Sequence, residues 1–266
     1  NVFNDDEDSW GRGMIKIYDN FTNDFLFPNV NSLLIFAENH DSKRLNQVYS
    51  SDIRKYKMAM AILATVRGIP QLYYGSEIGM AGDQNLGDAH IRQDFPGGWK
   101  NDSNNAFTIE GRTDIQNEYF DFTAKLFQWR KTKTVLHTGK MTHYIPEYNI
   151  YIYFRYDEFD SVMVLLNNSN ESQNVNPNRF QENLGYYKSG KDVTRLCFYS
   201  WDENLYLNEN ASTFITLSAV EMPLTETQPE PKNQKPEPVE DQYAIYNHCI
   251  KFTEKKVQFV EGSRNV

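Results

Sequence analysis

Apolar residues in the first half of the chain form a run, a helical repeat and a second run. Leu33 to Ala37 are apolar without interruption, as in a strand covered on both faces of a parallel sheet, so we predict a buried strand there. Apolar residues then recur at helical spacing from Ile53 to Ala64, and Ser50 and Ser51 are candidate N-caps. Ile69 to Gly75 predicts a second strand. Strand, helix and strand in this order imply a right-handed crossover and an α/β architecture.

The pattern changes after Gly75. A polar segment from Ser76 to about Asp114 is rich in Gly, Asp and Asn, and loops of this length tend to be functional or disordered. A helical stripe from Ile115 to Trp129 follows, closed by basic residues that suit a helix C-terminus. From Lys140 the period becomes two, which predicts antiparallel strands at 141–145, 150–156, 162–166, 193–199 and 214–219.

These changes of period divide the chain into three predicted parts. Residues 1–139 form the α/β part, residues 140–227 form a C-terminal β-sandwich domain, and residues 228–266 are a Pro-rich linker and tail to which we assign no role.

Charge and composition restrict the ligand. The 266 residues carry a formal charge of −9 with a pI near 5.1, which argues against nucleic acid and against an anionic membrane surface. No apolar run approaches the ~18 residues of a membrane helix. Aromatic residues make up 14% of the chain, which suits flat ligands such as sugar rings and equally suits aromatic-rich strands.

Four polar residues follow the first predicted strand at the end where catalytic groups lie in barrels of alternating strands and helices. The segment Phe36–Asp41, together with Arg44, resembles the fourth conserved segment of the α-amylase family, glycoside hydrolase family 13, usually written F-x-D-N-H-D-x-x-R. Glu38 stands where the family commonly has Asp, a position that is not the chemical one.

Further segments extend the resemblance over roughly residues 10–220. Arg67–Met80 is similar to the helix end, last barrel strand and following loop of the family. Phe95–Trp99, Gln116–Glu118 and Trp129–Lys133 resemble the neopullulanase and cyclomaltodextrinase branch, especially the forms in Bacteroides-type starch-utilisation systems. The resemblance implies the C-terminal part of a (β/α)₈ TIM barrel, about strands 7 and 8, followed by a β-sandwich domain.

The resemblance also implies a role for five residues. Asp41 matches the transition-state stabiliser, whose hydrogen bonds to the sugar 2-hydroxyl strengthen as the ring becomes oxocarbenium-like. His40 matches a neutral donor to sugar hydroxyls, and Asp88 and Arg92 match a pair that grips a more distant sugar. Arg44 is expected to orient nearby carboxylates. The structural alternatives are a turn cap for Asp41, a core histidine, a salt bridge between Asp88 and Arg92, and a surface arginine.

The family's nucleophile and general acid have no counterpart before this segment. A retaining glycosidase needs two carboxylates about 5 to 5.5 Å apart, and the family carries them on earlier barrel strands. Residues 1–32 contain neither pattern; Asp19 follows the partly apolar Met14–Tyr18 but has no Arg two residues before it. A whole barrel needs roughly 250 residues, so we expect the missing strands in cis or in trans and the chain alone to be inactive. A non-catalytic glucan-binding remnant and one half of a split enzyme are the alternatives.

The remaining expectations concern cofactors, partners and location. We expect an α-glucan oligosaccharide as ligand, with no nucleic acid or membrane as partner, and no cofactor or metal. Calcium occurs in parts of the family, but the spacing in Asn101–Asn104 is too loose to indicate a site, and Cys197 and Cys249 form no metal-binding spacing. A periplasmic or secreted location follows from the resemblance alone.

Overall fold

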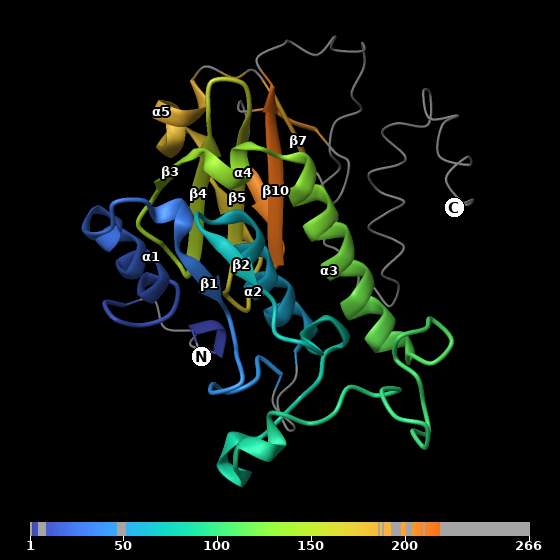
Figure 1. Ribbon diagram of the computed structural model, residues 1–266. Coiled ribbons are helices and arrows are strands. Elements are labelled where there is room, and N and C mark those ends of the chain that lie inside the picture. The colour runs from blue at the N-terminus through green and yellow to red at the C-terminus, as the bar shows by residue number, and fades with distance from the viewer. Residues whose placement is uncertain are drawn as a thin grey trace, which may run out of the picture.

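The computed structural model describes residues 2–4, 9–46, 52–185, 187, 189–192, 198–200, 204–209 and 211–218 (Figure 1). The predicted tail at 228–266 and both cysteines lie outside these residues. The elements of the first part, apart from short 3-10 turns, are α1 (Ile15–Phe21), β1 (Leu34–Phe36), α2 (Ile53–Thr65), β2 (Ile69–Gln71), α3 (Asp114–Thr132) and α4 (Val135–Thr138).

The predicted strand–helix–strand unit is confirmed, with β1 and β2 paired in parallel and α2 between them. Ser50 and Ser51 lie outside the described residues, and the side chain of Asp52 caps α2 by accepting from Arg54 N. Gly68, with φ of +105°, lets the two strands approach closely at their start. A Cβ at this position would lie only 2.7 Å from Leu33 O, so a residue with a side chain would not fit.

The prediction that the first strand is buried is wrong. Leu34 and Phe36 point outward with 59% and 48% exposure, while Ile35 packs against the core. Within the described residues, β1 and β2 pair only with each other. No further strand covers the outer face of this pair in the part of the chain that the structure describes. Apolar side chains that would suit a covered strand are therefore exposed to solvent.

The second part is a six-stranded antiparallel sheet in the order β3-β4-β5-β10-β7-β8, with a two-stranded sheet, β6-β9, beside it. The strands are β3 (Lys140–His143), β4 (Ile150–Tyr156), β5 (Ser161–Asn167), β6 (Gln173–Val175), β7 (Ser189–Asp192), β8 (Phe198–Ser200), β9 (Leu205–Leu207) and β10 (Ala211–Ser218). A short helix, α5 (Gln181–Leu184), follows β6. A single strand was predicted over 193–199, but β7 ends at Asp192 and residues 193–197 lie outside the described residues.

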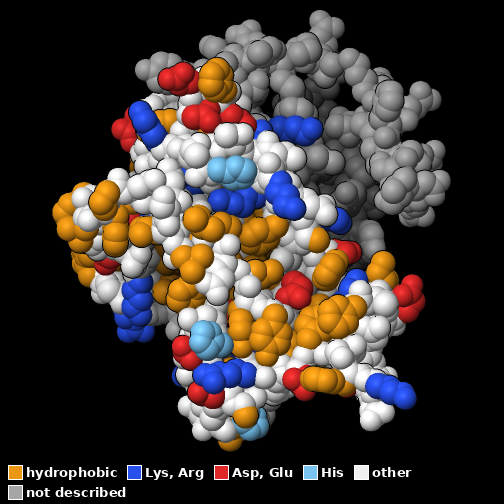
Figure 2. Space-filling model, in the orientation of Figure 1, with side chains coloured by type: hydrophobic (Ala, Val, Ile, Leu, Met, Phe, Trp, Pro, Cys, Tyr) orange, Lys and Arg blue, Asp and Glu red, His pale blue; other side chains and the backbone are white. Residues whose placement is uncertain are grey.

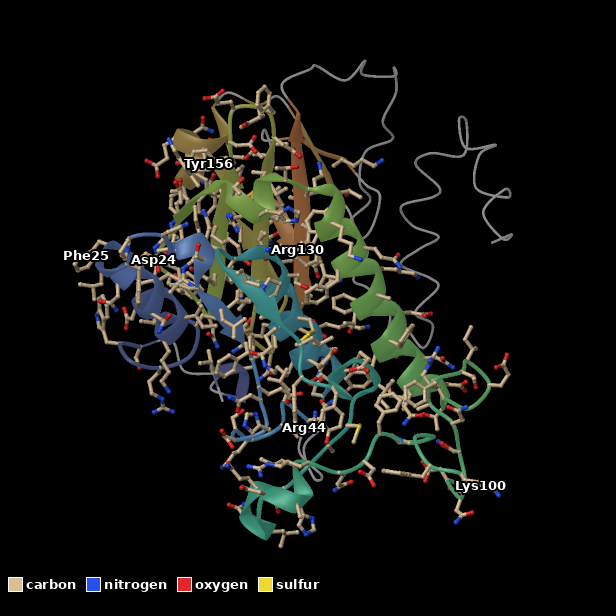
Figure 3. All side chains as sticks on the ribbon, viewed as in Figure 1. Asp24, Phe25, Arg44, Lys100, Arg130 and Tyr156 are labelled. Atoms are coloured by element: carbon tan, nitrogen blue, oxygen red, sulfur yellow. The ribbon has the colours of Figure 1, made fainter. Side chains whose placement is uncertain are left out.

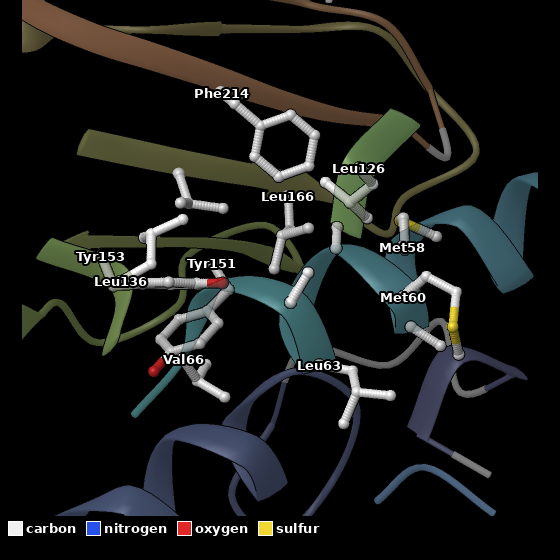
Figure 4. Close-up of a cluster of buried hydrophobic side chains, with 14 of the residues drawn as sticks. Met58, Met60, Leu63, Val66, Leu126, Leu136, Tyr151, Tyr153, Leu166 and Phe214 are labelled. Carbon is white, nitrogen blue, oxygen red and sulfur yellow. The ribbon is translucent and has the colours of Figure 1, made fainter. Parts of the chain in front are cut away.

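Alternate residues of the central strands face two different hydrophobic clusters. Tyr151, Tyr153 and Phe214 pack with α2 and α3 on one face, as Figure 4 shows for Met58, Met60, Leu63 and Leu126 beneath the sheet. Ile152, Phe154 and Ile215 pack on the other face against β6, β9 and α5. The α/β part and the sheet therefore share one core. The boundary predicted between residues 139 and 140 is not tested by this shared core and stays a prediction.

One segment differs from what the sequence pattern suggested, and the long polar loop agrees with it. Met14–Tyr18 is followed by Asp19 in the manner of a strand end, but the segment lies in helix α1 and its preceding turn. The long polar segment after β2 contains only short 3-10 turns before α3, at Ser76–Ile78, Gln84–Leu86 and Asp88–His90. It extends below the sheet in Figure 1, at the carboxyl ends of β1 and β2.

Candidate functional site

A tight turn after β1 presents His40 and Asp41 to solvent. The side chain of Asn39 accepts from Asp41 N at 3.0 Å, and Asn39 N donates to Ser42 Oγ at 2.8 Å. This local closure explains why the chain turns here, because Asn side chains hydrogen-bond their own backbone two residues on. The side chains of His40 and Asp41 are 62% and 66% exposed, and His40 Nε2 lies 3.2 Å from Asp41 Oδ2. His40 is therefore not a core histidine.

Arg92 joins the two predicted halves of the site. Its Nη2 donates to Asp41 Oδ1 at 2.9 Å and to Asp88 Oδ2 at 2.8 Å, and its Nε donates to His40 O at 2.9 Å. Asp88 and Arg92 do form the salt bridge that was the structural alternative, but the same guanidinium also holds Asp41. Four residues predicted from separate motifs thus meet in one exposed cluster.

Arg44 lies in the interior and not on the surface. It is 2% exposed, donates to Tyr74 O at 2.7 Å and to Ile91 O at 3.1 Å, and lies 4.0 Å above the Tyr73 ring. Its carboxylate neighbour is Glu38, at 3.5 Å. Arg44 therefore ties together the loops that follow β1 and β2, and Figure 3 shows it near the ends of these strands. Direct contact with a substrate stays a prediction.

Glu38 is a site residue whose importance the sequence did not reveal. It is 3% exposed and accepts hydrogen bonds from Leu45 N and from the Ser76 hydroxyl, besides its ion pair with Arg44. Buried charges are costly unless paired and hydrogen-bonded, and these three contacts meet that condition. The sequence feature that could have indicated this role is the position of a charged residue directly after an apolar strand. Glu38 holds the base of the turn that carries His40 and Asp41.

Glu77 lies in the short turn Ser76–Ile78 after β2, close enough to Arg44 and Glu38 for their charges to act on it. Burial raises the pKa of this carboxyl, opposed by backbone hydrogen bonds and by Arg44. Its Oε2 atom is buried and, among the described residues, has no hydrogen-bond partner. This arrangement identifies a carboxyl held in the folded chain at some energetic cost.

The described residues before β1 offer no carboxylate in the position expected for the nucleophile or the general acid. Asp19 lies on α1, and Asp24 accepts from Arg67 Nε at 2.9 Å. Neither residue follows a strand.

Within the described part of the chain, no group of three His, Cys, Asp or Glu side chains could hold a metal ion. In the Asn101–Asn104 segment, Asp102 Oδ2 accepts from the backbone of Gly97 and Trp99. None of the helices that the structure describes has the length and apolar character needed to cross a membrane.

Known proteins resemble the chain over both of its parts. Residues 141–216 match the family described as the cyclo-malto-dextrinase C-terminal domain. A cyclomaltodextrin glucanotransferase of Bacillus sp. (strain 1-1) is 33% identical over 140 residues, which is 53% of this chain and 17% of that protein. A cyclomaltodextrinase of Geobacillus thermopakistaniensis (strain MAS1) is 29% identical over 138 residues, 51% of this chain and 21% of that protein.

Solved structures share the fold. An α-amylase from Geobacillus thermoleovorans, complexed with acarbose, covers 76% of this chain with a TM-score of 0.60 and 22% identity, and 42% of that structure is matched. An Anoxybacillus α-amylase covers 83% of this chain with a TM-score of 0.64 and 19% identity, and 45% of it is matched. The chain thus spans less than half the length of the relatives it matches.

Proposed function

Because the chain belongs to the α-amylase family, glycoside hydrolase family 13, we propose that it is the C-terminal part of a retaining hydrolase of α-1,4-linked glucans. In this proposal β1 and β2 are about strands 7 and 8 of a (β/α)₈ barrel. The substrates are cyclodextrin, pullulan or maltodextrin. The observation that carries the proposal is the exposed cluster in which Arg92 holds Asp41 and Asp88.

Asp41 supplies the stabilising carboxylate in this mechanism. As the glycosidic bond breaks, the sugar ring gains oxocarbenium character, and hydrogen bonds from its 2-hydroxyl to a carboxylate strengthen by several kcal/mol. The Asn39 turn and the Arg92 guanidinium fix the position of Asp41 before substrate arrives, which reduces the cost of ordering it. His40 donates to a hydroxyl of the same sugar.

Asp88 and Arg92 bind a sugar farther from the cleaved bond. Sugar hydroxyls both donate and accept, so a carboxylate beside a planar guanidinium can satisfy both roles.

The nucleophile and the general acid belong to barrel strands in cis or in trans, and the chain without them is inactive. The proposed reaction uses no cofactor, metal, nucleic acid or membrane, and the protein acts in the periplasm or outside the cell.

The size of the native product tests this assignment. Mass spectrometry of the protein that contains the Asn39–Asp41 peptide in its source cells should find a product about twice this length, since a whole barrel needs roughly 250 residues. In that product Asp41→Asn should lower kcat on maltodextrin by at least about 100-fold. Asp121→Asn, an exposed carboxylate on α3, is the matched control and should leave kcat unchanged.

Two results would contradict the proposal. A product of this length that hydrolyses no glucan, even with other chains of the source cell present, would leave a non-catalytic binding remnant. Hydrolysis that survives Asp41→Asn would remove the role given to this residue.

A further inference from the structure

Residues 94–112, on the segment between β2 and α3, carry an exposed aromatic side chain in a fixed orientation, and we call this part of the segment the aromatic knob. Trp99 is 67% exposed, yet its indole Nε1 donates to Asp94 Oδ2 at 2.9 Å, and its backbone N donates to Asp102 Oδ2 at 3.1 Å. An exposed tryptophan with both donors engaged has a defined orientation. Its ring face stays in water although burying it elsewhere would be favourable.

The backbone beneath Trp99 is tightly packed despite having no regular secondary structure. Phe95 and Phe107 stack at 4.5 Å, and Ala106 N donates to Pro96 O at 3.0 Å. Gly97, with φ of +97°, lies so close to Asn105 that a Cβ would lie 2.4 Å from its Oδ1. These contacts join residues 95–97, which precede Trp99, to residues 105–107, which follow it.

Arg112 then anchors the knob to α3. It is 8% exposed, donates to Ala106 O at 3.0 Å and to Asn117 Oδ1 at 2.8 Å, and lies 4.1 Å from the centre of the Phe120 ring. The exposed aromatic ring is therefore built on a rigid base, which lowers the entropic cost of binding a ligand.

The knob also concentrates exposed apolar surface. Phe107 and Ile109 are 64% and 67% exposed in the same segment as Trp99. Figure 2 shows hydrophobic side chains on this lower part of the surface, where Figure 3 labels Lys100, the neighbour of Trp99. Contiguous exposed apolar side chains on a rimmed polar surface commonly mark a binding site.

The surrounding charges favour a neutral, hydroxyl-rich ligand. Asp94 and Asp102 each accept a hydrogen bond from Trp99, and two carboxylates in contact with the tryptophan disfavour an anionic ligand. Asp94 is exposed, and its second oxygen, Oδ1, can accept from a hydroxyl. An apolar ring face beside a hydroxyl acceptor matches a pyranose, which has C–H groups on its faces and hydroxyls on its edge.

From this geometry we infer that Trp99 and Asp94 form a second glucan-binding platform, outside the Asp41 cluster, that takes a distal unit of the same α-glucan. The inference rests on the proposed function for the identity of the glucan. Asp94 is two residues from Arg92, so their Cα atoms are at most about 7 Å apart. Asp94 in turn holds the Trp99 indole, so the platform lies within a few residues' reach of the Arg92 cluster, as binding of one extended glucan to both places requires.

Calorimetry with maltoheptaose on the full chain tests the platform. Trp99→Ala should weaken binding by about tenfold, because it removes the stacking face, while Trp99→Phe should retain most of the affinity. Trp10→Ala is the matched control, since Trp10 is 76% exposed in another part of the chain, and it should bind like the wild type. Maltose, which is too short to span both places, should lose less affinity than maltoheptaose does in Trp99→Ala.

A parallel Asp41→Ala variant separates this inference from the proposed function. If Trp99→Ala binds maltoheptaose as tightly as wild type while Asp41→Ala binds it more weakly, the platform is refuted and the Asp41 cluster stands. If only Trp99→Ala weakens binding, the platform stands and the cluster is refuted as a glucan site. A wild-type chain that binds no maltoheptaose refutes the platform, whereas the proposed function is tested separately by the size and activity of the native product.

Discussion

Glu77 shows how a single side chain under the candidate site stores unfavourable electrostatic energy. Burial raises its pKa above the ordinary value near 4.5, and the Oε2 atom lacks a partner among the described residues. An acid whose pKa is higher in the folded state destabilises that state when ionised. The penalty is present above the raised pKa and fades as the pH falls toward 4.5.

Glu77→Gln should therefore stabilise the chain at neutral pH, and its effect should diminish as the pH falls through the raised pKa toward 4.5, because the wild-type carboxyl becomes protonated as well. Thermal melts of both chains between pH 4 and pH 8 would measure the difference. Glu110→Gln, at an exposed position, is the control and should leave the melting temperature unchanged at each pH. A Glu77→Gln chain that is less stable at pH 7 would show that the carboxylate makes a net favourable interaction.

Residues with a local motif were predictable, and residues whose role depends on distant contacts were not. His40, Asp41, Asp88 and Arg92 were named from short motifs that resemble a known family. Their clustering was not predicted, because the bridge from Arg92 to Asp41 joins segments far apart in sequence. Glu38 was set aside because its position in the family segment is not the chemical one. Its burial was not predicted, since it depends on Ser76 and Arg44, which no local pattern brings beside it.

At the scale of elements, one arginine on β4 completes the ends of two helices. Arg155 is fully buried, and its guanidinium donates to Thr65 O at 2.8 Å and to Leu136 O at 3.2 Å, at the ends of α2 and α4. It also donates to Gly139 O at 2.9 Å. Burial lowers its pKa to about 10. Carbonyls at a helix C-terminus have no partner within the helix, and a cation there is favourable.

Arg155→Met should destabilise the chain by about 3 kcal/mol or more, because several buried carbonyls lose their donor at once. Urea unfolding would measure the loss. Arg54→Met is a matched control: Arg54 is half-exposed and pairs with Asp52 on the surface, so we expect a change within about 1 kcal/mol. Equal losses for the two variants would contradict the role given to Arg155.

Periodicity identified the long elements and failed on the short or two-sided ones. The strands β4 and β5 were expected, as were α2 and α3, because each shows several repeats of its period. The strands β6 and β9 were missed. Each has only three residues, which is too short for an alternation of apolar and polar positions to be recognised. For β1 the continuous apolar run correctly predicted a strand, but its burial depends on neighbours that the described residues do not supply.

At the scale of the whole molecule, the two-stranded sheet leaves an apolar surface without cover. Leu34, Phe36 and Ile69 are 59%, 48% and 53% exposed along β1 and β2. A hollow of about 800 Å³ opens beside them, lined largely by apolar residues of α1, β1 and α2. A strand edge next to apolar surface is a template for pairing with another chain.

The chain should consequently associate or show poor solubility when it is produced alone, and its isolated first part should do so more strongly, because it also loses the core shared with the sheet. Sedimentation of the 31.1 kDa chain would detect species larger than the monomer. Replacing Leu34, Phe36 and Ile69 together by Thr should shift the distribution toward monomer while the strands persist, since Thr favours extended backbone. Phe159→Thr is the control, because Phe159 is 94% exposed in the turn between β4 and β5, away from the strand pair, and isolated apolar side chains rarely drive association. A wild-type chain that is monomeric and melts cooperatively would show that the outer face of β1 and β2 needs no covering strands, and would weaken the case that this chain is part of a larger barrel.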